Sequence, residues 1–198
     1  MSGAGPEWPS ADEEDEEWQR PAGIFVLAPI GGSAVDAISE LQRRFDPKLA
    51  GGQPPHITLA GSSGVGPIRA GTSVEELRRC LSPVARTTPV LTLMLGTPRR
   101  FMQTRIISLP LDPHGPLRTL HDRIARSGLP FGPARFTFTP HVTLNLYRTL
   151  SRDAVRDLLA ERMYEPVILD RLLLSATDDP YPPRTLLELP FAATGSPT

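Results

Sequence analysis

Apolar and polar residues alternate in two short stretches of the chain, His-Ile-Thr-Leu beginning at His56 and His-Val-Thr-Leu beginning at His141. In each stretch, β-branched and aliphatic residues follow a proline, which is typical of the start of a β-strand. Neighbouring side chains of a strand point to opposite faces, so His56 and Thr58 share one face, as do His141 and Thr143. Each strand is therefore expected to present an imidazole and a hydroxyl on one surface and to bury two aliphatic side chains behind it.

The rest of the pattern predicts helices and strands in alternation. Apolar runs bounded by glycine or proline indicate strands, and apolar residues spaced three or four apart indicate helices. The expected strands are 23–30, 56–60, 90–96, 104–111, 140–147, 167–176 and 185–191. The expected helices begin at Ser33, Ser73, residue 116 and Ser151, where the serine hydroxyls are suited to cap the first turn. Residues 61–71 form a glycine-rich loop without the ending of a phosphate-binding P-loop and are interpreted as a mobile connection, and Pro98–Phe101 reads as a turn.

The predicted elements repeat. Their order is β-α-β-α-β followed by β-α-β-α-β-β, and each copy carries its His-x-Thr on the second strand. Alternating helices and strands favour α/β or α+β layers. We expect a single domain over 22–192, built from two pseudo-repeats at about 22–97 and 98–192.

Charge and composition indicate a tail at each end of the predicted domain. Residues 1–20 hold seven of the 22 acidic residues and one base, so 15 acids and 20 bases remain in the rest of the chain. Residues 1–21 are expected to be a disordered acidic tail and 193–198 a C-terminal tail. The remaining positive surplus suits an anionic ligand. The single cysteine, Cys80, lies on the apolar side of a predicted helix and fits a reducing compartment, and no apolar run approaches a membrane span.

The two histidines carry the candidate chemistry. A neutral imidazole can take a proton from an attacking oxygen while a charged one gives a proton to a leaving oxygen. A single His-x-Thr is common by chance, but two in equivalent places of a duplicated pattern favour function. His114 and His121 have no such partner, so turn and surface roles are expected for them. Neither a zinc-binding spacing nor a Gly-x-Ser-x-Gly motif is present.

At these residues the sequence resembles the two-histidine (2H) phosphoesterase superfamily, and within it the 2′-5′ RNA ligase and RNA 2′,3′-cyclic phosphodiesterase branch. The resemblance covers about residues 22–192 and rests on the doubled His-x-Thr-Leu. It implies a bilobal α+β fold in which two antiparallel-rich sheets flank a central cleft, with helices outside. It also implies chemistry that needs neither metal, cofactor nor ATP: opening 2′,3′-cyclic phosphates to 2′-phosphates, and making or breaking 2′-5′ linkages.

Carried onto this chain, the resemblance makes His141 the base toward water and His56 the acid toward the leaving O3′. Thr58 and Thr143 would hold the phosphate. Many relatives have an arginine three residues after the second threonine, but here that position is Leu146.

Other residues must then supply positive charge and further substrate contacts. Asn145 and Tyr147 share the His141 face of the strand. Arg105 is a candidate cation, beside Arg99 and Arg100, and Phe101 a candidate for stacking on a base.

Two other readings stay open at this point. The substrate can be a small cyclic metabolite such as ADP-ribose 1″,2″-cyclic phosphate, or the protein can be a module that binds RNA ends without turnover. In either case we expect a cytoplasmic monomer that meets RNA ends or cyclic nucleotides and no membrane.

Overall fold

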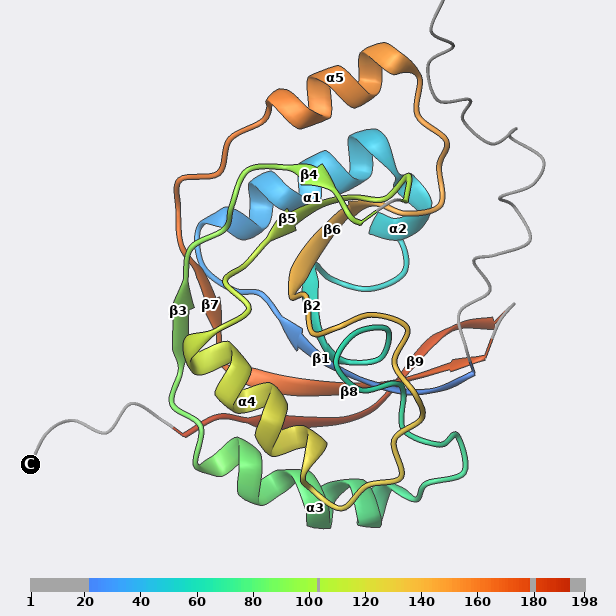
Figure 1. The fold of residues 1–198 in the computed structure, drawn as a ribbon, viewed down its shortest axis with the longest axis vertical. Coiled ribbons are helices and arrows are strands. Elements are labelled where there is room, and N and C mark those ends of the chain that lie inside the picture. Colours follow the sequence, from blue (N-terminus) through green and yellow to red (C-terminus); the bar gives the residue numbers. More distant parts are fainter. Residues whose placement is uncertain (1–21, 103, 179–180, 193–198) are drawn as a thin grey trace, which may run out of the picture.

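The structure, a computed structural model, describes residues 22–102, 104–178 and 181–192 (Figure 1). The two predicted tails, 1–21 and 193–198, lie outside the described residues. The strands are β1 (Gly23–Pro29), β2 (His56–Ala60), β3 (Leu91–Leu93), β4 (Arg99–Arg100), β5 (Ile107–Pro110), β6 (His141–Asn145), β7 (Val167–Leu169), β8 (Arg171–Asp178) and β9 (Tyr181–Pro190). The helices are α1 (Ala34–Phe45), α2 (Pro47–Ala50), α3 (Val74–Arg86), α4 (Gly115–Ala125) and α5 (Arg152–Ala160).

The predicted α+β class is confirmed. A seven-stranded sheet runs in the order β4-β5-β6-β2-β1-β8-β9, and β3 pairs with β7 in a small second sheet. The paired strands of both sheets are antiparallel. The two histidine strands, β2 and β6, are neighbours at the centre, where Ile57 and Val142 are in register. Two antiparallel ladders therefore meet at the strands that carry the motifs.

The two motif strands pair with their outer neighbours in the same way, β2 with β1 and β6 with β5. Thr58 lies opposite Leu27 of β1, and Thr143 lies opposite Ser108 of β5. In both ladders the histidine faces a proline and the pairing shifts just beyond the threonine, so each motif ends at an irregularity of its ladder. The two strands also share one pattern of burial, with the aliphatic side chains inside and the histidine and threonine partly exposed. One strand pair thus repeats the geometry of the other.

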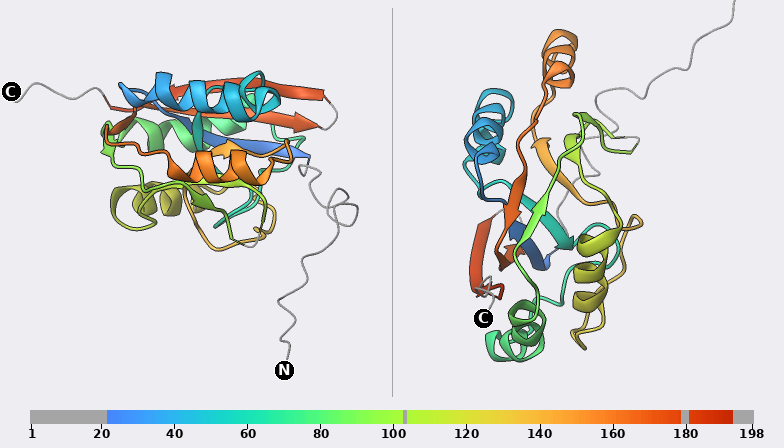
Figure 2. Two further views of the ribbon diagram at one scale, coloured as in Figure 1. Left: turned by 90° about the horizontal axis from the view of Figure 1, so that it is seen from above. Right: turned by 90° about the vertical axis from the view of Figure 1, so that its left-hand side faces the viewer.

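The helices lie on either side of the central sheet. In Figures 1 and 2, α1, α2 and α5 gather at one end of the molecule and α3 and α4 at the other. The predicted caps of α3 and α5 are present: Ser73 accepts from the N–H of Glu76 and Ser151 from that of Ala154, both at 3.2 Å. Ser33 precedes α1 without a side-chain cap bond. The short helix α2 was not predicted; Asp46 caps it and Pro47 begins it.

Several element boundaries differ from the expected ones. The strand predicted over 167–176 is divided at Asp170 into β7 and β8, which belong to different sheets. The predicted turn Pro98–Phe101 contains the edge strand β4, because Arg99 pairs with Ser108 and Arg100 with Ile107. Pairing with a distant strand decides both outcomes, and local sequence does not record it.

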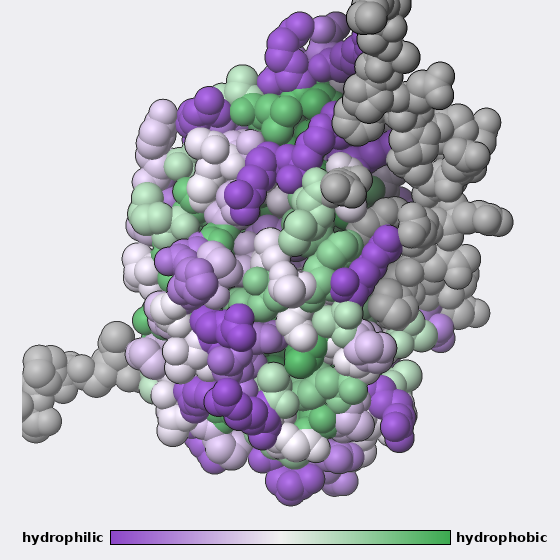
Figure 3. Space-filling view, in the orientation of Figure 1, coloured by the Kyte–Doolittle hydropathy of each residue, from purple (hydrophilic) through white to green (hydrophobic). Residues whose placement is uncertain are grey.

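Buried aliphatic side chains fill the space between the sheet and the helices. Ile57 and Leu59 of β2 and Val142 and Leu144 of β6 are completely buried, so the faces opposite the histidines are core. The face seen in Figure 1 carries apolar side chains near its middle, bordered by hydrophilic ones (Figure 3). No helix among the described residues is long and apolar enough to cross a membrane.

Candidate active site

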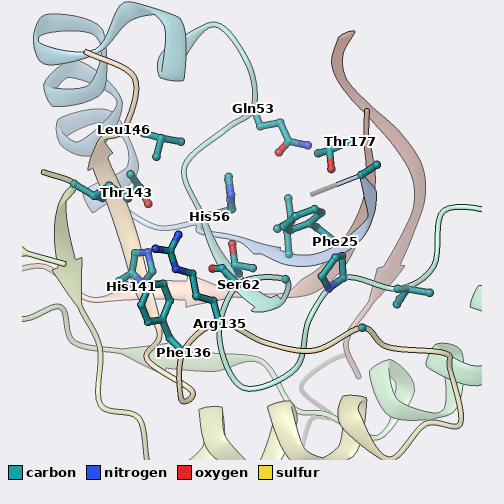
Figure 4. A pocket seen from close by; sticks show the side chains of 18 of the residues that line it. Phe25, Gln53, His56, Ser62, Arg135, Phe136, His141, Thr143, Leu146 and Thr177 are labelled. Atoms are coloured by element: carbon teal, nitrogen blue, oxygen red, sulfur yellow. The ribbon is translucent and has the colours of Figure 1, made fainter. Parts of the chain in front are cut away.

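One cavity of about 570 Å³ contains both motifs. His56 and Thr58 reach it from β2, and His141 and Thr143 reach it from β6. Figure 4 shows both histidines among the labelled side chains that line this cavity. The two strands are adjacent and antiparallel, so side chains on the same face of each converge on this space. The predicted convergence of two imidazoles and two hydroxyls is thus present in the structure.

The two imidazole rings are fixed in the same way. Nδ1 of His56 bonds to the carbonyl oxygen of Pro54 and Nδ1 of His141 to that of Thr139, each at 2.8 Å. A carbonyl oxygen only accepts, so Nδ1 carries the proton in both rings. The neutral form of either ring then has its lone pair on Nε2, and the charged form carries its second proton there. Nε2 is therefore the atom that exchanges protons in both residues.

The surroundings of His141 favour the neutral imidazole. Burial is the largest cause and lowers the pKa of His141, because a charged ring loses hydration there. The hydrogen bond that His141 donates to the carbonyl oxygen of Thr139 acts in the opposite direction, and the positive charge of Arg99 lowers this pKa further. The ring of Phe101 packs against the imidazole, with centroids 4.3 Å apart and a 38° tilt. At neutral pH, His141 is accordingly suited to accept a proton.

The structure separates the remaining predicted site residues into two groups. Phe101 and Tyr147 line the cavity with the two motifs. Asn145 is buried, and its side-chain amide donates to the carbonyl oxygen of Arg148 at 2.8 Å, so it is turned away from the cavity. Arg105 is not among the residues that line the cavity. The pairing of β6 with β5 is irregular beyond Thr143, so side chains no longer alternate strictly there. This explains why Asn145 does not share the face of His141.

Comparison with known proteins agrees with this arrangement. A sequence model of the 2′-5′ RNA ligase superfamily matches residues 31–179, which include both motifs. This chain belongs to that superfamily. Among curated proteins, no sequence matches it.

Solved structures show the same fold at low sequence identity. E. coli LigT in its apo form is 19% identical, with a TM-score of 0.52, and the match covers 88% of this chain and 100% of that one. E. coli LigT complexed with 3′-AMP is 17% identical, with a TM-score of 0.51 and coverage of 87% and 99%. The likeness in α+β fold to E. coli LigT thus covers 87–88% of this chain.

This member of the superfamily has an arginine at the site that sequence reasoning missed. Leu146 lines the cavity, and so does Arg135 from the loop before β6. Figure 4 shows Arg135 running beside His141 toward the space between the two histidines. Its guanidinium carbon lies 5.3 Å from the centroid of the Phe136 ring. Nothing in the local sequence marks Arg135, because its position depends on a loop partner far along the chain.

That partner is the glycine-rich loop. The backbone N–H groups of Arg135 and Phe136 both donate to the carbonyl oxygen of Ser62 at 3.2 Å. Gly66 donates to the carbonyl oxygen of Gly132, and a Cβ at Gly66 would lie 2.3 Å from the carbonyl oxygen of Pro133. Part of the segment 61–71, which was interpreted as a mobile connection, is thus packed against the loop that carries Arg135, and its glycines allow this close approach.

Two side chains of the first half hold the second motif strand. Asp46 is completely buried and accepts from the backbone N–H groups of Leu146 and Tyr147, each at 2.7 Å. The side-chain amide of Gln42 donates to the carbonyl oxygen of Thr143 at 2.7 Å. Asp46 followed by proline is a helix-start signal in the sequence, but its second role across the site depends on the tertiary fold.

His121 corrects a further expectation. It is buried, and its Nδ1 bonds to the carbonyl oxygen of Leu59 on β2 at 2.8 Å, so the predicted surface role is wrong. Its ring stacks on Phe138, with centroids 4.0 Å apart. His114 lies on the surface before α4, as expected. Among the described residues, no group of three His, Cys, Asp or Glu side chains is arranged to hold a metal ion.

Proposed function

We propose that this protein opens 2′,3′-cyclic phosphates at RNA ends to 2′-phosphates, and makes or breaks 2′-5′ linkages, by acid–base catalysis with His56 and His141. The observation that carries the proposal is the matched pair of His-x-Thr strands, which share register, burial and the Nδ1 hydrogen bond. Two imidazoles oriented alike across one cavity supply the two proton transfers that phosphodiester opening needs.

His141 acts as the base in this mechanism. Its lowered pKa keeps Nε2 unprotonated near neutral pH, so it can accept a proton from water. The water oxygen then forms a bond to phosphorus. His141 becomes charged in this step, which its buried site tolerates only while the negative charge of the phosphate lies beside it.

His56 acts as the acid. In its charged form, Nε2 gives a proton to O3′ as the bond between phosphorus and O3′ breaks. The product is a 2′-phosphate with a free 3′-hydroxyl, and exchange of one proton with solvent restores both imidazoles. With a 5′-hydroxyl in place of water, the same transfers join a 2′-5′ linkage. In the reverse direction O3′ attacks phosphorus, the 5′-oxygen leaves with a proton and the linkage is broken, and no ATP enters the balance in either direction.

Three further side chains stabilise the phosphate. Thr58 and Thr143 each follow their histidine by two residues and lie on the same face of the strand. Their hydroxyls donate to the non-bridging oxygens of the phosphate. Arg135 supplies the positive charge that the leucine at 146 lacks, and its planar fork suits two phosphate oxygens. Such fixed donors stabilise the charge that develops in the transition state.

The remaining lining fits a nucleoside. A cavity of about 570 Å³ is within the usual size for small-molecule sites, and aromatic rings line it, among them Phe25, Phe131 and Tyr147. Aromatic faces stack bases without regard to sequence. This favours an RNA end of any sequence as the substrate.

The test is turnover of adenosine 2′,3′-cyclic phosphate by purified protein, followed by ³¹P NMR with and without EDTA. We expect the 2′-monophosphate as the sole product and the same rate in EDTA. Formation of the 3′-monophosphate, or activity that EDTA abolishes and a divalent ion restores, would contradict the proposed chemistry. Tight binding without turnover would instead support the binding-module reading, and turnover of only ADP-ribose 1″,2″-cyclic phosphate the metabolite reading.

A further inference from the structure

A second cavity, of about 280 Å³, borders the first. His141 and Phe101 line both cavities, so the second begins at the ring that the proposed mechanism uses as its base. Its other lining residues include Arg99 and Arg100 of β4 and Thr139, whose carbonyl oxygen binds His141. The second cavity therefore continues the active site toward the edge strand of the sheet.

The charge of this cavity is positive. Arg99 and Arg100 are both exposed and lie next to each other on β4. Among the residues that the structure describes, no acidic side chain lines the second cavity and none forms an ion pair with either arginine. Both arginines line this cavity, so it attracts an anion, and their planar guanidinium forks match phosphate.

The chemistry of the substrate indicates which anion. A 2′,3′-cyclic phosphate stands at the 3′ end of an RNA strand, so the strand continues only from the 5′-oxygen of that nucleoside. The next negative charge along the strand is the phosphate on this 5′-oxygen. With the cyclic phosphate between the two histidines and Arg135 assigned to it, the cavity beside His141 is a further basic region next to it.

We propose that Arg99 and Arg100 bind the phosphate on the 5′ side of the reacting nucleotide. This inference rests on the proposed function and narrows its substrate class to RNA strands rather than single cyclic nucleosides. Binding energy from this contact lies away from the reacting bond. It distinguishes substrates that carry the extra phosphate from those that lack it.

The experiment compares two substrates: adenosine 2′,3′-cyclic phosphate and the dinucleotide ApA ending in a 2′,3′-cyclic phosphate. The readout is the ratio of their kcat/KM values. For the unchanged protein we expect the dinucleotide to be favoured about tenfold, the worth of one charge-assisted hydrogen bond. In the double variant Arg99→Ala/Arg100→Ala this ratio should fall to near one, and Arg99→Lys/Arg100→Lys should retain part of it.

The chain offers a matched control. Arg78 and Arg79 are also adjacent and exposed, but they lie on α3 and line neither cavity. Arg78→Ala/Arg79→Ala removes the same charge and should keep the full ratio. A variant that is partly unfolded loses activity on both substrates alike, so the ratio remains informative.

Each failure is distinct. If the unchanged protein opens both substrates with equal kcat/KM, or if Arg99→Ala/Arg100→Ala keeps the dinucleotide preference, the phosphate site is wrong while the proposed function stands. If neither substrate is opened, the proposed function itself fails. The preference should also shrink as salt is raised, because exposed charges are screened.

Discussion

His56 and His141 are held by the same hydrogen bond in two different parts of the chain. In each, Nδ1 bonds at 2.8 Å to the carbonyl oxygen two residues earlier, that of Pro54 or Thr139. Each of these carbonyls belongs to the residue before a proline, and proline restricts that residue to extended backbone conformations. The proline of each motif thus helps to aim a carbonyl at the imidazole, which fixes the tautomer of both rings.

Because the two histidines act together in the proposed mechanism, the losses of activity caused by substituting each of them should not add. We expect His56→Ala and His141→Ala each to lower kcat for cyclic phosphate opening by about 10²–10⁴-fold. The double variant should be little slower than the slower single variant, since either change breaks the same pair of proton transfers. Thr58→Ala and Thr143→Ala should cost less, because each removes a hydrogen bond but no proton transfer.

The control for this set is His114→Ala, an exposed histidine at the start of α4 that lines neither cavity. It should retain full activity. Near-normal turnover by His141→Ala, in protein whose thermal midpoint is unchanged, would show that another group is the base.

Arg99 should influence the pH dependence of the rate. Its positive charge lowers the pKa of His141, so its removal raises that pKa. If His141 is the base, its protonation sets the acid limb of the kcat/KM profile, and Arg99→Gln should move this limb to higher pH. The shift should shrink in high salt, because Arg99 is exposed.

Arg79→Gln, which changes a distant exposed charge on α3, should leave the limb where it is. A limb that stays fixed in Arg99→Gln, or moves to lower pH, would contradict the assignment of His141 as base. The measurement is the apparent pKa of the acid limb of kcat/KM in each variant and in the unchanged protein.

The sequence predicted the parts of the site that depend on local pattern. Period-2 alternation put each histidine and its threonine on one face, and the antiparallel pairing of β2 with β6 then brings both pairs into the cavity. The repeated element order also predicted that the two motif strands are equivalent. We propose on the same grounds that 22–97 and 98–192 are repeats, supported by the pairing of β3 with β7, which end the two βαβαβ units.

The positions of side chains that depend on long-range contacts could not be predicted from the local pattern. Arg135 reaches the cavity because its loop bonds to Ser62, more than seventy positions earlier. Asn145 leaves the cavity because the ladder is irregular beyond Thr143, whereas alternation predicted the opposite. Tertiary hydrogen bonds decide both cases, and a single sequence does not encode them as a visible period.

Asp46 should be needed for both stability and activity. Its buried carboxylate accepts three backbone N–H groups, those of Leu49, Leu146 and Tyr147. Asp46→Ala leaves these donors without their acceptor, and we expect a loss of about 3 kcal/mol in the free energy of unfolding. Activity should fall as well, because Leu146 and Tyr147 line the cavity.

Urea unfolding followed by circular dichroism measures this loss. Asp46→Asn keeps one oxygen acceptor and should be destabilised less than Asp46→Ala. Asp36→Ala, which removes an acidic residue from the first turn of α1, serves as the control and should cost well under 1 kcal/mol. Equal stability of Asp46→Ala and the unchanged protein would mean that these hydrogen bonds are replaced by others.

His121 should make the protein less stable in mild acid. Burial is the largest cause that lowers the pKa of His121, with Arg118 acting in the same direction and Leu59 and Asp122 against it. The unfolded chain therefore binds a proton at this residue at a higher pH than the folded chain does. The contribution of His121 to the free energy of unfolding has its full value above about pH 6.5, the pKa of the imidazole in the unfolded chain. It falls as the pH drops below that value.

The measurement is the urea midpoint at pH 7.5 and at pH 5.5. His121→Gln should be less stable than the unchanged protein at pH 7.5, because the imidazole stack on Phe138 is lost. It should lose less of its remaining stability on going to pH 5.5, whereas His114→Gln, at an exposed position, should lose as much as the unchanged protein. His141 also has a lowered pKa and contributes in the same direction, so part of the acid sensitivity should remain in His121→Gln. If His121→Gln loses as much stability between pH 7.5 and pH 5.5 as the unchanged protein does, His121 takes up its proton in the folded state. Protonation then does not open the contact between α4 and β2.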